Sequence, residues 1–341
     1  MTAGRQMAAE MAEQPAVLAS IAARREEIAE AVRSVRPDPF HGTVLVARGS
    51  SDHAAVFARY LLEPATGRPV ALAAPSLHTL YGARVDYTGF LVIAVSQSGR
   101  TPEIATLVER LAAAGAGTLA LTNEAASPVA AAAGASVALD AGAEEAVPAT
   151  KTFTAQAAAL ALVAEALGPV PWTAEDWGAL PGVVEAVLGD PGPAERVAAA
   201  LEAATGLLAV GRGPCFAMAL EAALKLKETT GVHAEGFSAA DVRHGPKAIV
   251  SPGFPVLALS AEGPAAADVG ELVASLRESG AAVYEAGDRP GAALPVTGGL
   301  PEALTALATV VRAQQLALAL ARLRGLDPDA PSGLSKVTPT T

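Results

Sequence analysis

The chain has 341 residues, of which 51% are apolar, 4% aromatic and 17% charged, and its formal net charge is −11. This length suits two domains of ordinary size, and the acidic balance argues against nucleic acid or an anionic membrane as a partner. The single cysteine, Cys215, excludes an internal disulfide and is typical of a reducing compartment. Glu165 and Arg312 interrupt the longest apolar stretches, and residues 1–10 lack the apolar core of a signal peptide. We therefore expect a cytoplasmic protein that does not enter a membrane.

In chain order, the sequence predicts an N-terminal helix over residues 5–33, followed by alternating strands and helices. Strands are expected near 43–48, 69–73, 90–95, 117–121 and 136–139, and again near 206–210, 255–259 and 282–285. Such alternation is typical of a parallel sheet with helices on both faces. The predicted fold is α/β, with two tandem doubly wound (flavodoxin-like) domains.

Two strand–loop pairs recur at one offset and indicate an internal duplication. Thr43-Val-Leu-Val-Ala-Arg-Gly49 is similar to Leu207-Leu-Ala-Val-Gly-Arg-Gly213, and Phe90-Leu-Val-Ile-Ala-Val-Ser-Gln-Ser-Gly99 is similar to Phe254-Pro-Val-Leu-Ala-Leu-Ser-Ala-Glu-Gly263. The copies are 164 residues apart in both pairs. We expect an N-terminal helix (1–34), a first domain (35–170), a second domain (171–324) and a C-terminal tail (325–341).

The turn Ser96-Gln-Ser-Gly-Arg-Thr101 predicts a phosphate site. It follows a buried strand and precedes a helix that begins at Pro102, with Thr101 as its N-cap. Hydroxyls, backbone N–H groups and the positive end of the helix dipole favour an anion there. The alternative is an ordinary loop with polar capping residues. In the second repeat Glu262 replaces Ser98 and would repel phosphate, so we expect that copy to have lost anion binding.

A polar segment in the second repeat contains the residues suited to acid–base chemistry. Glu221, Lys225 and Glu228 are spaced to share one helix face, and His233 and His244 follow. A solvated helix face with ion pairs is the ordinary meaning of this spacing. A carboxylate and an imidazole near a phosphate-anchored substrate would instead suit proton transfer next to a carbonyl. Because no metal-ligand cluster or glycine-rich dinucleotide motif accompanies them, we expect no metal and no cofactor.

These motifs resemble the sugar isomerase (SIS) proteins, in particular the tandem isomerase half of the glucosamine-6-phosphate synthases (glutamine–fructose-6-phosphate aminotransferases). The resemblance covers essentially the whole chain. Its markers are Glu10-Met-Ala-Glu-Gln-Pro15, Gly49-Ser-Ser51, Ser96-Gln-Ser-Gly99, Ala149-Thr-Lys-Thr-Phe-Thr-Ala-Gln156, Ala219-Leu-Glu-Ala-Ala-Leu-Lys-Leu-Lys-Glu228, His244-Gly-Pro246 and Arg324-Gly-Leu-Asp-Pro-Asp329.

The resemblance implies a role for each matching residue. Glu228 corresponds to the proton-shuttling carboxylate, Lys225 to the lysine one turn before it, and Lys336 to the lysine that engages the open-chain carbonyl. His244 corresponds to a ring-opening histidine that reaches across from the other subunit, which implies a homodimer with shared active sites. The implied substrate-binding residues are Gly49, Ser50, Ser51, Ser96, Gln97, Ser98, Thr101, Val147 and Ala149.

The departures from the synthases bear on the reaction. The sequence contains no glutaminase domain, so we do not expect glutamine-driven synthesis. Arg100 replaces the family's glutamate, and Ala149 replaces a sugar-facing serine. Ser-Gly-Arg-Thr-Pro-Glu and Ser-Lys-Val-Thr are more similar to the stand-alone SIS-type aminosugar-phosphate deaminases.

Several functions therefore remain open. The leading one is a deaminase that converts glucosamine 6-phosphate to fructose 6-phosphate and ammonia. The alternatives are a deglycase for a 6-phosphorylated fructosamine adduct, an aldose–ketose isomerase, or a regulatory SIS protein that binds a sugar phosphate without turnover.

Overall fold

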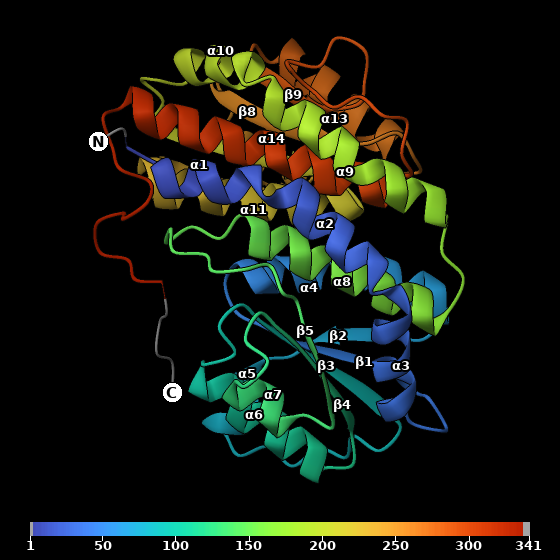
Figure 1. Ribbon diagram of the computed structural model, residues 1–341. Helices are drawn as coiled ribbons and strands as arrows, with labels where there is room; N and C mark the ends of the chain where they lie inside the picture. Colours follow the sequence, from blue (N-terminus) through green and yellow to red (C-terminus); the bar gives the residue numbers. More distant parts are fainter. Residues whose placement is uncertain (1–2, 337–341) are drawn as a thin grey trace. The chain divides into compact units, whose positions relative to one another are not determined.

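The computed structural model describes residues 3–336 and divides into two compact units (Figure 1). The first-repeat unit comprises Ser20–Glu144 and Lys151–Pro171. The second-repeat unit comprises residues 3–19, Glu145–Thr150 and Trp172–Lys336. The predicted tail extends beyond this description, since 337–341 lie outside the described residues.

A five-stranded parallel sheet forms the centre of the first-repeat unit. Its strands are β1 (Gly42–Val46), β2 (Val70–Leu72), β3 (Phe90–Ser96), β4 (Gly117–Thr122) and β5 (Ala135–Ala138), in the order β2-β1-β3-β4-β5. The helices are α3 (Arg25–Val35), α4 (Ser50–Thr66), α5 (Pro75–Thr79), α6 (Pro102–Ala113), α7 (Pro128–Ala132) and α8 (Lys151–Leu167). Strand β3 is an apolar run buried from Leu91 onward, as expected for a strand covered on both faces.

The second-repeat unit contains a sheet of the same design. Its strands are β6 (Gly206–Gly211), β7 (His233–Ser238), β8 (Pro255–Ser260), β9 (Ala282–Gly287) and β10 (Leu294–Pro295), in the order β10-β9-β8-β6-β7. Its helices are α1 (Arg5–Ala12), α9 (Ala174–Gly189), α10 (Gly192–Ala200), α11 (Pro214–Thr230), α12 (Ala239–Val242), α13 (Ala266–Glu278) and α14 (Glu302–Leu323), with a 3₁₀ turn at Pro246–Ile249. Helix α2 (Gln14–Ala23) spans the division between the units.

The two sheets confirm the predicted fold class and duplication. In both, the first strand lies between the second and third, which is the flavodoxin-like order. Val44 pairs with Val92, and Leu208 with Val256, so the register repeats after 164 residues. Gly49 (φ 59°, ψ −135°) and Gly213 (φ 59°, ψ −139°) adopt the same left-handed conformation before α4 and α11. Glycine is favoured at both positions because a side chain would be strained at this φ.

The structure corrects the prediction in two places. The N-terminal segment expected as one helix over 5–33 is three helices, because the chain turns at Glu13 before Pro15 and again at Arg24. Strands β7 and β10 were not predicted. Strand β7 is an edge strand that pairs only with β6. Because His233 and Glu235 are exposed polar residues, its sequence does not have the apolar pattern of a buried strand.

Helix α14 is the core helix of the second-repeat unit. Within residues 3–336 it is the one helix long and apolar enough to cross a membrane, and 94% of its most apolar window is buried inside the structure. Arg312, which interrupts its apolar face, donates from Nε to the Pro295 carbonyl (2.8 Å) and from Nη1 to the Val187 carbonyl (3.1 Å). The charge is therefore compensated by backbone oxygens within the fold.

Candidate functional site

The serine turn after β3 is built to present hydroxyl groups. Ser96 Oγ accepts a hydrogen bond from the Gly99 N–H (3.1 Å), and Ser98 Oγ accepts one from the Arg100 N–H (3.2 Å). Because both hydroxyl oxygens already accept, each can donate its own proton to an incoming anion. The Gln97 carbonyl accepts from the Asn123 N–H (3.1 Å), which ties the turn to the end of β4.

Two helix N-termini flank this turn in the first-repeat unit. Strands β1 and β3 are hydrogen-bonded neighbours, and the residues that follow them lead into α4 and α6. Ser50 and Ser51 form the first turn of α4, while Thr101 is the residue before α6. Thr101 holds the predicted N-cap position, but its side chain makes no capping hydrogen bond. The partial positive charge of both helix ends favours an anion at this edge of the sheet.

Gly99 fixes the shape of the turn. Its φ is +61°, and a Cβ placed on it would lie 2.1 Å from Ser127 Oγ. Ser127 is itself committed, since its Oγ accepts from the Ala130 N–H as the N-cap of α7. The turn can therefore approach α7 closely only with glycine at this position.

The charged side chains beside the turn are largely neutralised. Arg48 donates from Nε and Nη2 to the two carboxylate oxygens of Glu103, both at 3.0 Å. Glu103 is buried in the first turn of α6. Arg48 therefore anchors α6 to the end of β1, and Arg100 remains as an exposed positive charge on the turn itself.

The equivalent turn of the second repeat is occupied by the protein's own carboxylate. The Glu262 N–H donates to both oxygens of Asp288, at 2.9 and 3.2 Å. Glu302 lies close by, and the pKa of its carboxyl group is raised above its ordinary value. Burial is the largest cause and the negative charge of Asp288 adds to the rise, while a hydrogen bond from the Ala265 N–H opposes it. This turn therefore carries the Asp288 carboxylate on its backbone N–H group and has a second acidic residue beside it.

Helix α11 carries the candidate acid–base group of the second-repeat unit. Lys225 Nζ lies 2.5 Å from Glu228 Oε2 and 3.4 Å from Glu221 Oε1. The side chains of Glu221 and Lys225 are 0% and 1% exposed, whereas that of Glu228 is 20% exposed. A solvated helix face is therefore the wrong interpretation of this spacing. One buried ammonium holds the Glu228 carboxylate where it can still meet a substrate.

A clamp of backbone and side-chain hydrogen bonds fixes the loop 145–150. The Glu10 carboxylate accepts from the N–H groups of Glu145 and Ala146, the latter at 3.2 Å. The Val147 N–H donates to the Asp329 carbonyl (3.0 Å). Val147 and Ala149, the predicted sugar-facing residues, lie on this loop. The loop is therefore held from α1 on one side and from the C-terminal segment on the other.

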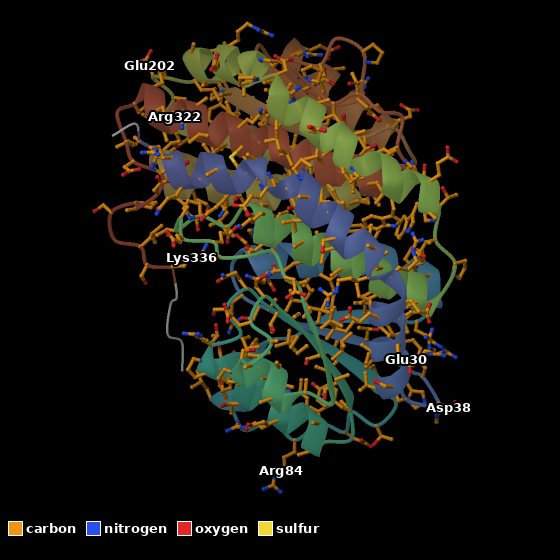
Figure 2. All side chains as sticks on the ribbon, in the orientation of Figure 1. Glu30, Asp38, Arg84, Glu202, Arg322 and Lys336 are labelled. Carbon is orange, nitrogen blue, oxygen red and sulfur yellow. The ribbon has the colours of Figure 1, made fainter. Side chains whose placement is uncertain are left out.

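The same C-terminal segment positions Lys336. Lys336, labelled in Figure 2, donates from Nζ to the Ala146 carbonyl at 2.7 Å. Asp329 closes the connection, since its side chain accepts from the N–H groups of Gln6 (3.0 Å) and Met7 (2.8 Å) at the start of α1. Sequence reasoning missed the roles of Glu10 and Asp329, although both lie in motifs that it singled out.

His244 is an exposed residue of the second-repeat unit. It lies on an exposed turn between α12 and the 3₁₀ turn, where its N–H donates to the Asp241 carbonyl (2.9 Å). Within residues 3–336 its imidazole makes no hydrogen bond or ion pair. His233 (80% exposed) and Glu235 (47% exposed) pair with each other at 3.5 Å on β7.

The predicted site residues thus fall into two sets. Gly49, Ser50, Ser51, Ser96, Gln97, Ser98 and Thr101 belong to the first-repeat unit. Val147, Ala149, Lys225, Glu228, His244 and Lys336 belong to the second-repeat unit. The first-repeat unit holds the serine turn, and the second-repeat unit holds the Lys225–Glu228 pair and the clamped loop.

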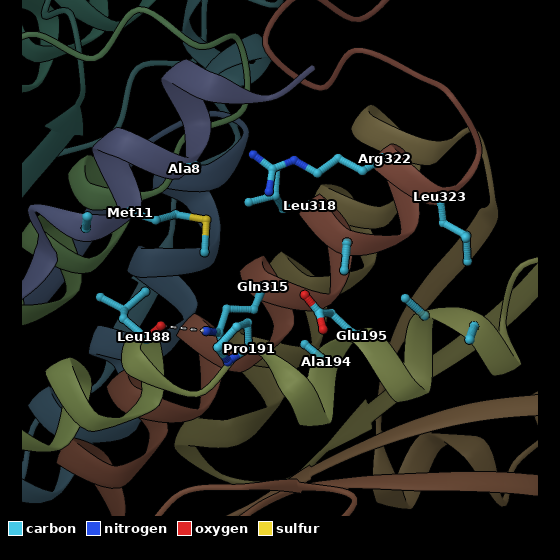
Figure 3. A pocket seen from close by; sticks show the side chains of 14 residues that line it. Ala8, Met11, Leu188, Pro191, Ala194, Glu195, Gln315, Leu318, Arg322 and Leu323 are labelled. Atoms are coloured by element: carbon cyan, nitrogen blue, oxygen red, sulfur yellow. Dashed lines mark hydrogen bonds between the residues drawn. The ribbon is translucent and has the colours of Figure 1, made fainter. Parts of the chain in front are cut away.

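A separate cavity in the second-repeat unit lies between α1, α10 and α14 and has a volume of about 500 Å³ (Figure 3). Its walls include Ala8, Met11 and Leu318, and Glu195 and Arg322 supply its charges. None of the predicted site residues lines it, so its size does not make it the reaction site.

Comparison with known proteins agrees with the resemblance seen in the sequence. The family model described as SIS domain matches residues 42–166 and 201–286. The glutamine–fructose-6-phosphate aminotransferase (isomerizing) of Methanothermobacter thermautotrophicus is 34% identical over 300 residues, which are 85% of this chain and 50% of that protein. The chain spans about half the length of the curated relatives it matches.

Solved structures share the fold over nearly the full length. A candidate phosphosugar isomerase from Silicibacter pomeroyi is 34% identical with a TM-score of 0.86, covering 95% of this chain and 99% of that one. The C-terminal domain of glucosamine-fructose-6-phosphate aminotransferase from Francisella tularensis has a TM-score of 0.84 at 21% identity, with 96% and 98% covered. Glucosamine-6-phosphate deaminase from Thermotoga maritima has a TM-score of 0.75 at 24% identity, with 95% and 99% covered. At the identities of the last two, the likeness shows the fold alone.

Proposed function

This chain belongs to the SIS domain family, and from that premise we propose that it is a phosphosugar isomerase that acts as an aminosugar-phosphate deaminase in the cytoplasm. Its substrate is glucosamine 6-phosphate and its products are fructose 6-phosphate and ammonia. The observation that carries the proposal is the Lys225–Glu228 pair, which holds a partly exposed carboxylate by a buried ammonium.

The serine turn supplies the anchor for the phosphate. The hydroxyls of Ser96 and Ser98 can donate to phosphate oxygens while their own oxygens remain bonded to the loop backbone. The hydroxyls of Ser51 and Thr101, near the starts of α4 and α6, complete the proposed set. A phosphate so bound fixes the sugar chain for reaction at its other end.

Glu228 carries the proton in the proposed reaction. After His244 opens the ring, the Glu228 carboxylate removes the proton from C2 of the open-chain 2-amino aldose while the carbonyl oxygen at C1 takes up a proton from solvent, giving an enolamine; the solvent proton is returned when ammonia leaves. The same carboxyl returns the proton to C1, which leaves an imine at C2. Water adds to the imine, ammonia leaves, and the ketose 6-phosphate remains. The reaction consumes one water, releases one ammonia and transfers no electrons, and Lys336 engages the open-chain carbonyl oxygen.

Cys215 is not placed to act as a nucleophile that would release ammonia from glutamine. Cys215 is 1% exposed, and burial raises the pKa of its thiol, with the negative charges of Glu302 and Asp288 adding to the rise. A buried, protonated thiol is a poor nucleophile. We propose that ammonia leaves as a product, in keeping with the deaminase-like Arg100 and Ser335-Lys336.

We further propose that the active enzyme is a homodimer in which His244 serves the site of the other subunit. Mixing inactive Glu228→Gln protein with inactive His244→Ala protein then restores part of the activity, because one site of a mixed dimer keeps both residues. Subunit exchange is followed separately with differently tagged chains. Exchange without recovered activity would place His244 in the site of its own subunit.

The proposed reaction is tested by measuring ammonia and fructose 6-phosphate from purified protein. Glucosamine 6-phosphate is expected to react, whereas glucosamine is expected to react poorly because it lacks the anchor. Ammonia-free turnover of an aldose 6-phosphate would indicate an aldose–ketose isomerase, and turnover of a 6-phosphorylated fructosamine alone would indicate a deglycase. Stabilisation against heat by these sugars without any product would indicate a regulatory binding protein.

A further inference from the structure

The cavity between α1, α10 and α14 is large enough for a small organic molecule (Figure 3). Its volume of about 500 Å³ lies in the range of ligand-binding pockets, whereas packing voids inside proteins are rarely larger than a water molecule. Its lining residues are all apolar except Glu195, Gln315 and Arg322. The cavity therefore favours a molecule with an apolar body.

Two of the three polar side chains are already bonded within the fold. Gln315 donates from Nε2 to the Val187 carbonyl (3.0 Å), and its Oε1 accepts from Arg312 Nη1 (2.9 Å). Arg322 donates from Nε and Nη2 to two backbone carbonyls at the start of α1, at 2.9 and 3.1 Å. The guanidinium of Arg322 thus ties the end of α14 to the start of α1.

Glu195 supplies the uncompensated charge of the cavity. Within residues 3–336 its carboxylate makes no hydrogen bond or ion pair. In Figure 3 this carboxylate reaches from α10 into the cavity beside α14. A carboxylate accepts a stronger hydrogen bond from an ammonium than from a neutral donor, and it repels an anion. Apolar walls with one available carboxylate therefore fit an apolar molecule that carries a protonated amine.

The cavity also lies against the helix that holds the clamped loop 145–150. Ala8, Met11 and Ala12 line the cavity at the i, i+3, i+4 spacing of one face of α1. Glu10 lies on the other face of α1 and accepts hydrogen bonds from the N–H groups of the clamped loop. A molecule in the cavity would pack against the first face and reduce the motion of the helix that carries Glu10.

We propose that this cavity is a binding site for a small apolar molecule with one protonated amine, and that its occupation steadies α1 and the clamped loop. The ammonium pairs with Glu195, and the apolar body packs between Met11 and Leu318. This inference does not depend on the proposed reaction, because binding and hydrogen exchange are measured without turnover. A chain that binds the amine and deaminates no sugar would leave it standing.

Methyl NMR of isotope-labelled methionines measures the binding. Met11 lines the cavity, whereas Met218 is buried in α11 and serves as the internal reference. The probe is 2-phenylethylamine, and 2-phenylethanol and 3-phenylpropanoate are its neutral and anionic counterparts. The amine is expected to shift the Met11 signal with a Kd about fivefold lower than that of the alcohol, and the carboxylate is expected to bind more weakly than the alcohol. No shift of Met11 with the amine, or equal binding of all three, would overturn the proposal.

Two variants test the charge and the location separately. Glu195→Gln changes an exposed position and is expected to bind the amine and the alcohol equally. Ala8→Leu fills part of the cavity and is expected to weaken the binding of both about tenfold with an unchanged circular dichroism spectrum. Glu202→Gln, the same charge removal at an exposed position outside the cavity, is the control and is expected to keep the preference for the amine. A Glu195→Gln protein that still prefers the amine, or an Ala8→Leu protein that binds as tightly as wild type, would overturn the site.

Hydrogen exchange tests the effect on the clamped loop. Saturating 2-phenylethylamine is expected to slow exchange at 145–147 about threefold, because binding disfavours local opening of the segment. Exchange at β5 in the first-repeat unit is the control and is expected to stay unchanged. In Glu10→Gln the Met11 signal is expected to shift as before, but exchange at 145–147 no longer responds. Unchanged exchange at 145–147 in wild type with the Met11 signal fully shifted would contradict the proposed effect.

Discussion

Lys225 Nζ lies 2.5 Å from Glu228 Oε2 on one face of α11, and the same ammonium lies 3.4 Å from the buried Glu221. Lys225 therefore has two roles. It neutralises the buried Glu221 carboxylate, and it orients the Glu228 carboxylate, which remains partly exposed to solvent. Removal of the ammonium is expected to affect stability through Glu221 and turnover through Glu228.

The stability effect follows from the burial of the pair. Lys225→Met leaves the Glu221 charge buried without its cation, which is expected to lower the free energy of unfolding by about 3–5 kcal/mol. Lys225→Met combined with Glu221→Gln removes both charges and is expected to recover a large part of the loss. Urea unfolding of the two single variants and the double variant measures this coupling. Additive losses would show that the two side chains do not depend on each other.

The serine turn is expected to act on the phosphate alone. Ser96→Ala and Ser98→Ala each remove one charge-assisted hydrogen bond worth about 1.5–3 kcal/mol, so kcat/KM for glucosamine 6-phosphate is expected to fall about 10- to 100-fold for each. The low activity on glucosamine is expected to stay unchanged. Ser136→Ala, on an exposed position of β5, is the control. An equal loss on both sugars would mean that the turn does not bind the phosphate.

Much of this architecture is readable from the sequence, and the reasons differ between its parts. The apolar run 91–95 and the proline-led start of α6 are local signals, so β3 and its serine turn were predicted correctly. Strand β7 could not be predicted in this way. It lies at the edge of its sheet and carries exposed polar residues, so its sequence lacks the apolar run of a buried strand.

The clamp was beyond sequence reasoning for another reason. Glu10 and Asp329 form hydrogen bonds with backbone groups of residues that are distant in the sequence. Backbone groups are nearly the same at every residue, so the sequence does not show which of them form these bonds. The burial of Glu221 was also unreadable, since spacing along a helix does not say which face is covered. The family resemblance implies roles for Glu228 and Lys336, and the structure shows what holds these two side chains in place.

The clamp is expected to position the loop 145–150 rather than take part in chemistry. Glu10→Gln weakens the bonds to the Glu145 and Ala146 N–H groups, and kcat is expected to fall about tenfold with a loss of about 1–2 kcal/mol in unfolding free energy. Hydrogen exchange at 145–147 should rise in parallel. Glu13→Gln, on an exposed position of the next turn, is the control. Faster exchange with unchanged kcat would make Glu10 a purely structural residue.

The raised pKa of Glu302 is expected to make the folding stability of the second-repeat unit depend on pH. Its carboxyl pKa is raised in the folded protein by burial and by Asp288. The folded state then holds the proton to a higher pH than the unfolded chain does, so stability falls as pH rises through the folded-state pKa. Glu302→Gln is expected to be more stable than wild type at pH 8, and the advantage should vanish below about pH 4. A constant difference across this range, or a less stable variant at pH 8, would contradict the assigned shift.

The central claim, that Glu228 moves a proton from C2 to C1, is tested most directly with glucosamine 6-phosphate deuterated at C2. Wild type is expected to yield fructose 6-phosphate in which part of the deuterium is found at C1 by NMR. Glu228→Gln is expected to lower kcat about 10²- to 10⁴-fold with little change in KM, while Glu202→Gln at an exposed position behaves as wild type. Deuterium transfer at a near-normal rate in Glu228→Gln would contradict the account.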